Sequence, residues 1–191
     1  MINIGNIEGK VGNNQLAGDV TLNGKFLPAG QVSFDFPDLK LLAGLAGQSA
    51  SGGISGKVAL DNTSDKLGLS LTAKSDSVTF SDITARAINA DIAVSDAAAL
   101  KASGSINVGS VAVAGKTVSD IALTASNAGS STDFNLSAKY ENDPVEIAAS
   151  VVRGQTMEID LTKLEGSPMA LALSLAEPGR IVVSNLSLIH I

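Results

Sequence analysis

The chain has 191 residues, of which 45% are hydrophobic and only 3% aromatic, and it carries 13 lysines and arginines against 19 aspartates and glutamates. This hydrophobic content excludes a disordered chain, and the net charge of −6 argues against nucleic acid as a partner, because a polyanion would be repelled. The absence of cysteine excludes thiolate metal sites and cysteine nucleophiles, and no run reaches the roughly 18 apolar residues of a membrane-spanning helix.

Apolar and polar residues alternate strictly along most of the chain. In residues 66–74, for example, Leu67, Leu69 and Leu71 share one phase, while Ser70 and Thr72 share the other. Successive side chains of a strand point to opposite faces, so this period of two predicts strands with one aliphatic face and one polar face.

In chain order, strands are predicted near 2–8, 15–23 and 31–36, separated by turns that include 28–30. After a linker at 48–53 the strands continue, with turns expected at residues 62–65, 75–77, 95–97, 127–131, 141–144, 154–155 and 177–179. The sequence of residues 118–123 weakly resembles that of residues 89–94, which suggests a repeat of about 29 residues.

One segment departs from the β pattern. Leu39, Leu42, Ala43 and Ala46 recur at helical spacing, and Pro37 suits a first helical turn. Residues 37–47 are therefore predicted to form a short amphipathic helix, with a glycine at its end.

The predicted fold class is all-β: an elongated, meandering sheet curled into an open, taco-shaped or solenoid-like groove. Residues 1–36 supply its first strands, 37–47 the helix and 51–184 the remaining strands. Residues 186–191 are expected to be a non-native tail, because the alternation slips there and the string resembles translated adaptor sequence. The chain starts and ends in mid-pattern, which favours an internal piece of a larger protein.

No catalytic constellation is recognisable, so an enzyme is not expected, and neither is a cofactor or metal. The lone His190 falls in the doubtful tail. Residues 52–58 resemble a phosphate loop only superficially, since Val58 replaces the required Ser or Thr, and 61–65 lack the glycine and glutamate of a calcium loop. Both segments are better interpreted as ordinary turns.

The aliphatic face is the remaining functional candidate, although such faces commonly exist only to bury themselves in a core. Apart from 37–47 there is no helix to cover the sheet, so the sheet must fold on itself or keep a groove open. The residues expected to line that groove are Val58, Leu60, Leu69, Leu71, Ile92, Val94, Ile121, Leu123, Phe134, Leu136, Ile147, Val151, Ile159 and Leu161.

Several passages resemble the TamB-type family of the AsmA-like superfamily. Residues 33–47 followed by 50–60 are similar to its helix-then-strand passage, with a D-L-x-x-L-x-x-L helix and a G-x-x-x-G-x-V-x-L strand. Residues 109–126 resemble its short strand, glycine turn and longer strand. Residues 161–173 and 177–183 resemble its L-x-x-L-x-G and P-x-x-I/L passage. The order and spacing of these ordinary elements carry the resemblance.

The resemblance implies a periplasmic location, in a parent protein anchored to the inner membrane by a segment outside this chain. It also implies an open apolar β-groove that conducts phospholipid by its acyl chains and supports outer-membrane biogenesis and β-barrel assembly. An outer-membrane β-barrel partner of the TamA or BamA type would bind regions beyond this fragment.

Two other interpretations remain open. A structural or adhesive surface β-solenoid, such as an autotransporter stalk, would share the composition but have a closed aliphatic core and a more regular repeat. Another member of the AsmA-like lipid-transfer group would keep the same mechanism.

Overall fold

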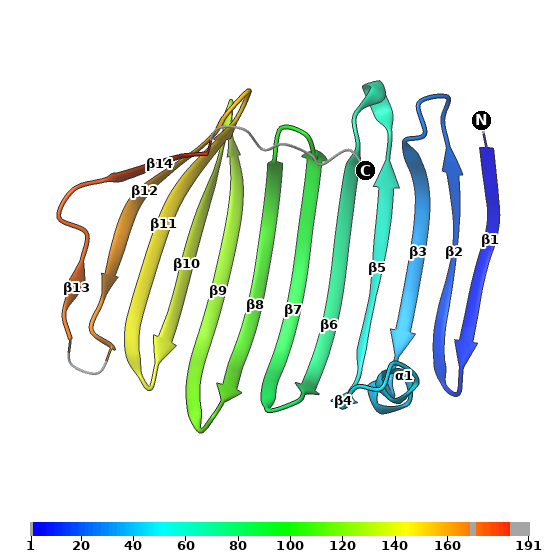
Figure 1. The fold of residues 1–191 in the computed structure, drawn as a ribbon, viewed down its shortest axis with the longest axis horizontal. Coiled ribbons are helices and arrows are strands. Elements are labelled where there is room, and N and C mark those ends of the chain that lie inside the picture. The colour runs from blue at the N-terminus through cyan, green and yellow to red at the C-terminus, as the bar shows by residue number, and fades with distance from the viewer. Residues whose placement is uncertain (1, 169–170, 184–191) are drawn as a thin grey trace.

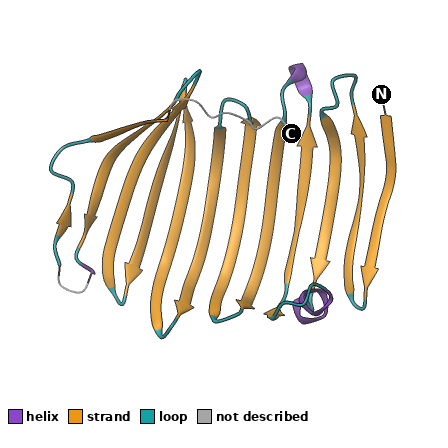
Figure 2. Ribbon diagram, in the orientation of Figure 1, coloured by secondary structure: helices purple, strands orange, loops and turns teal. Residues whose placement is uncertain are grey.

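The computed structural model of the chain describes residues 2–168 and 171–183. Within these residues the chain forms one antiparallel sheet of 14 strands that does not close, with one short α-helix at its edge (Figures 1 and 2). The all-β prediction and the open sheet are thus confirmed. The strands are β1 (Ile2–Val11), β2 (Asn14–Leu22), β3 (Pro28–Phe36), β4 (Ala50–Gly52), β5 (Ile54–Asp61), β6 (Gly68–Phe80), β7 (Ile83–Asp96), β8 (Lys101–Val113), β9 (Lys116–Ala128), β10 (Ser131–Tyr140), β11 (Asp143–Arg153), β12 (Met157–Gly166), β13 (Leu173–Ser174) and β14 (Gly179–Val183).

The strand order follows the chain from β1 to β13, with two exceptions. β4 pairs only with the end of β6, while β5 lies between β3 and β6. β13 and β14 both pair with β12, at opposite ends of it, so together they form an interrupted edge strand. We call the two ends of the strands upper and lower, as they appear in Figure 1, where the helix lies at the lower end.

The helix α1 (Leu39–Leu45) lies inside the predicted segment 37–47. The Asp38 side chain caps it by accepting hydrogen bonds from the backbone N–H groups of Lys40 and Leu41. The helix is only seven residues long and buries none of its side chains. The helix therefore lies at the lower ends of the strands and does not cover a face of the sheet.

Two predicted turns are wrong. Residues 28–30 belong to β3 and residues 75–77 lie within the 13-residue strand β6. Small polar residues favour turns locally, but the partner strand β7 runs past Ser75 and Ser77 and keeps both paired, opposite Ile88 and Arg86. The segment is an irregular part of a long strand. The predicted tail, residues 186–191, lies outside the described residues.

This irregularity extends across the sheet as a line of interrupted pairing. Paired positions flank Asp76, Ala87, Gly109 and Asp120 in β6, β7, β8 and β9, but no pairing joins these four residues themselves. Ala87 and Asp120 have φ values of 52°. Because each strand contributes one unpaired residue, the register between these strands is the same on both sides of the line.

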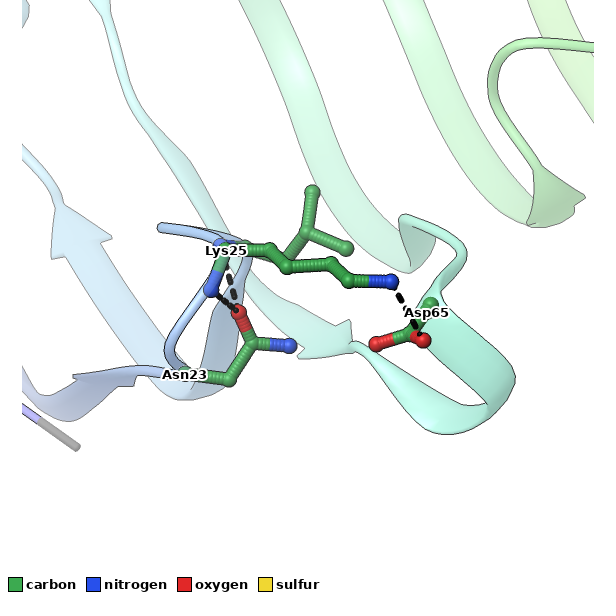
Figure 3. Close-up of polar contacts among 4 residues, drawn as sticks. Asn23, Lys25 and Asp65 are labelled. Carbon is green, nitrogen blue, oxygen red and sulfur yellow. Dashed lines mark hydrogen bonds and ion pairs between the residues drawn. The ribbon is translucent and has the colours of Figure 1, made fainter.

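The upper connections are fastened to one another by polar contacts. Lys25 of the β2–β3 connection forms an ion pair of 2.6 Å with Asp65, which lies before β6, while the Asn23 side chain accepts a hydrogen bond from the Lys25 backbone N–H (Figure 3). Asn62 donates to the Leu27 carbonyl at 3.0 Å. The ion pair is exposed and contributes little stability, so these contacts mainly orient the loops.

Asn14 performs a similar task at the lower end, but as a buried residue with 1% exposure. Its side-chain N–H group donates to the carbonyl oxygens of Val11 and Asp38, and its side-chain oxygen accepts from the Asp38 backbone N–H at 3.0 Å. One side chain thus joins the β1–β2 turn to the start of the helix.

We expect Asn14→Ala to lower the free energy of unfolding by about 2 kcal/mol, because it leaves the part-buried Asp38 N–H and carbonyl groups without their Asn14 partner. Urea unfolding followed by circular dichroism measures the loss. Asn13→Ala, in the same turn and exposed, serves as the control and should change stability by less than about 0.5 kcal/mol. Equal effects of the two substitutions would contradict this role of Asn14.

Asp96, the last residue of β7, connects this strand to Lys66 before β6 and to Ala99 in the β7–β8 connection. Its carboxylate lies 2.9 Å from the Lys66 ammonium group and accepts a hydrogen bond from the Ala99 backbone N–H at 3.0 Å. The hydrogen bond from Lys66 and then that from Ala99 lower the pKa of Asp96 below its ordinary value, against the opposing effect of burial. These contacts therefore favour the ionised carboxylate in the folded chain.

Because the pKa of Asp96 is lower in the folded than in the unfolded chain, its stabilising contribution is present above about pH 4 and is lost as the pH falls through the folded value. We expect Asp96→Asn to lower the urea midpoint at pH 7 and the deficit to shrink at about pH 2.5. The control for loss of one negative charge is Asp91→Asn, on the exposed face of β7. A deficit for Asp96→Asn that stays constant across this range would refute the assignment.

Candidate functional site

The strand registers align the apolar residues into rows that cross the sheet. Residues directly opposite one another in neighbouring strands lie on the same face. One row, which we call the central row, consists of Ile7, Gly18, Val32, Val58, Leu71, Ile92, Gly104, Ala125, Phe134, Ala149, Leu161 and Gly179. It runs from β1 to β14 without a polar side chain.

A second apolar row lies two residues away on the same face. It consists of Gly9, Leu16, Phe34, Gly56, Ala73, Ala90, Ile106, Leu123, Leu136, Ile147 and Leu164. The row between these two faces the other way, as the pleat requires. It consists of Glu8, Ala17, Ser33, Lys57, Thr72, Asp91, Ser105, Thr124, Asn135, Ala148 and Lys163. We call the two faces the apolar face and the polar face.

All fourteen residues predicted to line a groove lie on the apolar face. Five belong to the central row and three to the second row, and Ile121 lies opposite Val108, two residues from the second row in β9. Of the rest, Leu60 and Leu69 lie opposite each other, and Leu69 lies opposite Val94. Val151 lies opposite Ile159, two residues from the central row in β11 and β12. Sequence reasoning thus placed every one of these side chains in the correct phase.

The sequence prediction missed the part of the apolar face that precedes Val58. Val20, Val32, Phe34 and Ile54 continue it across β2, β3 and β5. The alternation in these segments was visible, but the register that joins them to the later strands was not. The rings of Phe34 and Phe36 stack there with centroids 5.5 Å apart.

The apolar face is only partly covered. Each of the fourteen predicted residues is half-buried, and the buried hydrophobic residues in the described part of the chain are only Val20, Ala73, Ala90 and Ala125. Side chains sealed in a core would be almost wholly buried. This sheet instead keeps a wide aliphatic surface in contact with solvent.

The sheet curls toward its apolar face near the upper ends of β8 to β10. Thr132 of β10 lies on this face, opposite Val151, and is 1% exposed. Its hydroxyl donates to the Leu100 carbonyl at 2.8 Å, immediately before β8, although β9 separates β8 from β10 in the sheet. Two strands that are not neighbours can meet in this way only if the apolar face is the concave one.

Glycines on the apolar face allow close approach between strands. A Cβ atom on Gly56 would lie 2.3 Å from the Thr72 carbonyl oxygen and 2.6 Å from the ring of Phe34. The ring of Phe34 therefore occupies the space that a side chain at Gly56 would fill. Glycines placed in this way are a common means of bending a sheet.

Charged side chains concentrate on the polar face and at the strand ends. Lys139 pairs with Asp120 at 2.8 Å, Lys163 with Glu146 at 2.5 Å, and Arg180 contacts Asp160 at 2.6 Å. The hydrogen bond that Lys139 donates to Asp120 raises the pKa of Lys139, and the one that Arg180 donates to Asp160 raises the pKa of Arg180. These side chains are partly or largely exposed to solvent, so the pairs add solubility more than stability.

A hollow of about 500 Å³ opens where β4 and β5 separate. Asp35, Lys74, Asp76 and Ser77 contribute to its lining, and the buried Ser75 hydroxyl donates to the Gly53 carbonyl beside it. This hollow has a mixed lining, which also includes Pro37 and Ile54, and it lies outside the two apolar rows. It marks a break in the sheet and is not part of the aliphatic surface.

Among residues 2–168 and 171–183, no group of three or more histidine, cysteine, aspartate or glutamate side chains is arranged to hold a metal ion. In the same residues, no helix has both the length and the apolar character needed to cross a membrane. The apolar face is thus the feature of the described chain that most needs a functional explanation.

Comparisons with models of protein families, with curated proteins and with solved structures gave no match to this chain. Its function therefore has to be argued from the geometry of the sheet.

Proposed function

We propose that the chain is a segment of a lipid conduit, in which phospholipid acyl chains move along the apolar face from strand to strand. The observation that carries the proposal is the central row, which crosses twelve strands without a polar side chain and in which every residue but Ala125 stays partly exposed. At about 4.8 Å per strand, such a row extends on the order of 50 Å.

The magnitudes support an acyl chain as the occupant. Exposing a methylene group to water costs about 0.8 kcal/mol, so a 16-carbon chain faces a cost on the order of 12 kcal/mol. An aliphatic trough removes most of this cost along the whole path. A soluble polar ligand would gain nothing from such a surface.

The uniformity of the face favours movement over tight binding. The central and second rows contain aliphatic residues, glycine and only two phenylalanines, and they include no charged group. Neighbouring positions then offer similar contact energies, and an apolar chain meets no deep minimum as it shifts by one strand. A transfer path requires such similar contact energies along its length, whereas a storage site requires a closed pocket with specific polar contacts.

The resemblance to TamB-type proteins supplies the cellular setting of the proposal. In that setting the chain is part of a periplasmic bridge, anchored to the inner membrane elsewhere in its parent, which delivers phospholipid to the outer membrane and supports β-barrel assembly there. A TamA-like or BamA-like β-barrel would be engaged by another region. A different AsmA-like lipid-transfer protein would use the groove in the same way.

The alternative is an adhesive surface solenoid with a closed aliphatic core. Such a stalk would bury its stacked aliphatic residues, as closed β architectures do. The partly exposed residues of the central row, in a single antiparallel sheet that stays open, favour the conduit over the stalk.

A photo-crosslinking amino acid at Leu69 or Leu136 tests the proposal directly. We expect covalent phospholipid to be recovered from these positions after irradiation in cells, because both lie on the apolar face. The matched controls are the neighbouring residues Ser70 and Ser137, which are exposed on the polar face and should recover little or none. Absence of lipid from all four positions would favour the stalk.

A further inference from the structure

The apolar face continues for one further row on each side of the central and second rows. The upper flanking row lies two residues above the central row and runs through Val20, Leu60, Leu69, Val94 and Ile159. Leu60 and Leu69 lie beside the upper ends of β5 and β6, so the face ends there.

The lower flanking row lies two residues below the second row. It runs through Phe36, Ile54, Ile88, Val108 and Ile121. In β7, β8 and β9 the line of interrupted pairing follows directly below it. The regular apolar face is therefore bounded at both ends of the strands.

These four rows set the width of the apolar face. Rows on one face are two residues apart, so four of them span about 20 Å along the strands. The hydrocarbon core of a bilayer is about 30 Å thick and holds two layers of acyl chains, so one layer needs about 15 Å. The apolar face is therefore wide enough for an acyl chain that lies parallel to the strands.

Exposed apolar side chains gather at the lower ends of the strands. They are Leu41 and Leu45 of α1, Phe80 and Ile83 beside the β6–β7 turn, and Val113 at the end of β8, with exposed fractions from 40% to 72%. Phe80 lies opposite both Ile83 and Ala50 of β4, the strand that follows α1. The lower ends thus offer further apolar contacts beyond the lower flanking row.

The connections at the upper ends are polar instead. Lys25 and Asp65 form the exposed ion pair beside Asn23 (Figure 3), and Lys66 pairs with Asp96. Among the described residues of the upper connections, Phe26 is the single large apolar side chain that is exposed. A charged headgroup therefore finds polar partners and water at the upper ends, and the end of an acyl chain finds apolar groups at the lower ends.

The direction in which a lipid lies decides where its headgroup falls. A lipid that lay along the rows would place its phosphate over the aliphatic residues of the central row, and a charge is costly in apolar surroundings without partners. Lifting the phosphate away from the face would remove the nearest methylene groups from contact. A lipid that lies along the strands keeps its headgroup in water and its chains on the face.

We propose that the apolar face binds glycerophospholipid with the acyl chains parallel to the strands, the headgroup at the upper connections and the chain ends toward the lower flanking row. The inference rests on the proposed function and adds the orientation of the lipid and the chain length that fits. A lipid held in this way moves sideways from strand to strand, and its headgroup stays at the upper ends throughout.

Two single-cysteine variants of the purified 191-residue chain test the orientation. The chain has no cysteine of its own, so Phe26→Cys and Leu45→Cys each direct a nitroxide quencher to one position. The two side chains are matched, being 70% and 72% exposed, and they lie beyond the upper and lower ends of β3. The nine residues of β3 between them separate the labels by about 30 Å.

The probes are fluorescent phospholipids. We expect dipalmitoyl phosphatidylethanolamine with a fluorophore on its headgroup amine to be quenched several-fold more by the label at Phe26→Cys than by that at Leu45→Cys. The same lipid with pyrene at the end of one acyl chain should show the reverse order. The dilauroyl lipid with pyrene at its chain end should be quenched less by the label at Leu45→Cys, because its shorter chains stop above the lower flanking row.

Equal quenching by the two labels, or any other order, would overturn the orientation and leave the conduit standing. Equal quenching of the dilauroyl and dipalmitoyl chain ends at Leu45→Cys would also overturn it, since chains that run along the rows do not approach the lower ends as they lengthen. Failure of the unmodified chain to bind either lipid would overturn both proposals.

Discussion

Gly104→Val is expected to destabilise the folded chain by about 4 kcal/mol or more, the largest effect of any single substitution considered. Gly104 has a φ of 124°, a conformation that valine strongly disfavours. A Cβ atom there would lie 2.0 Å from the Asp91 carbonyl oxygen and 2.9 Å from the Ile92 Cα. Because both contacts are to the backbone of β7, no side-chain movement can relieve them.

Urea unfolding followed by far-ultraviolet circular dichroism measures this loss. Gly154→Val is the control, because no atom lies within 4 Å of a Cβ built there and its φ is not in the left-handed region. The control should shift stability by less than about 1 kcal/mol. A Gly104 variant as stable as the Gly154 variant would show that β7 and β8 do not approach as closely as described.

The position of Gly104 also relates this prediction to the curvature of the sheet. It lies in the central row, opposite Ile92 on β7 and Ala125 on β9, near the curl held by Thr132. Its close contact with β7 lets the sheet bend where β8 turns toward β10. The same glycine therefore contributes to the curvature that makes the apolar face a groove.

The second large effect is expected in transport. We expect Leu136→Asp to reduce lipid transfer by about tenfold to a hundredfold, because a carboxylate in the second apolar row breaks the path between Leu123 and Ile147. Ser137→Asp puts the same charge on the exposed polar face and should leave transfer near normal. An envelope-integrity assay, such as sensitivity to detergent, reports the difference in cells.

This experiment has to distinguish unfolding of the variant protein from interruption of the lipid-transfer path in a folded variant. Leu136→Asn introduces a polar group without charge and should have an intermediate effect, and circular dichroism of each purified variant checks the sheet. Equal impairment by the Leu136 and Ser137 aspartates, with the sheet intact, would rule out a transfer path over the apolar face.

The phases of the strands were predictable because they are a local property. In β6, for instance, Leu69, Leu71 and Ala73 had to share one face once the segment was extended. The same reasoning placed all fourteen candidate residues on one face and located α1 from its helical spacing. Their contact with lipid stays a prediction.

The errors arose where local signals compete with pairing. Ser75 and Ser77 carry small polar side chains typical of a turn, yet hydrogen bonding to β7 on one side keeps the segment extended. The interrupted pairing at Ala87 was equally hidden, because alanine does not normally signal a left-handed conformation.

The sequence by itself determined the strand class, the two chemically distinct faces and the single helix, because side-chain alternation and helical spacing depend only on neighbours along the chain. Only the tertiary structure decided the register that aligns Ile7 through Gly179 into one row and the curl held by Thr132. These features depend on hydrogen bonds and close backbone contacts between residues far apart in sequence, which no local pattern encodes.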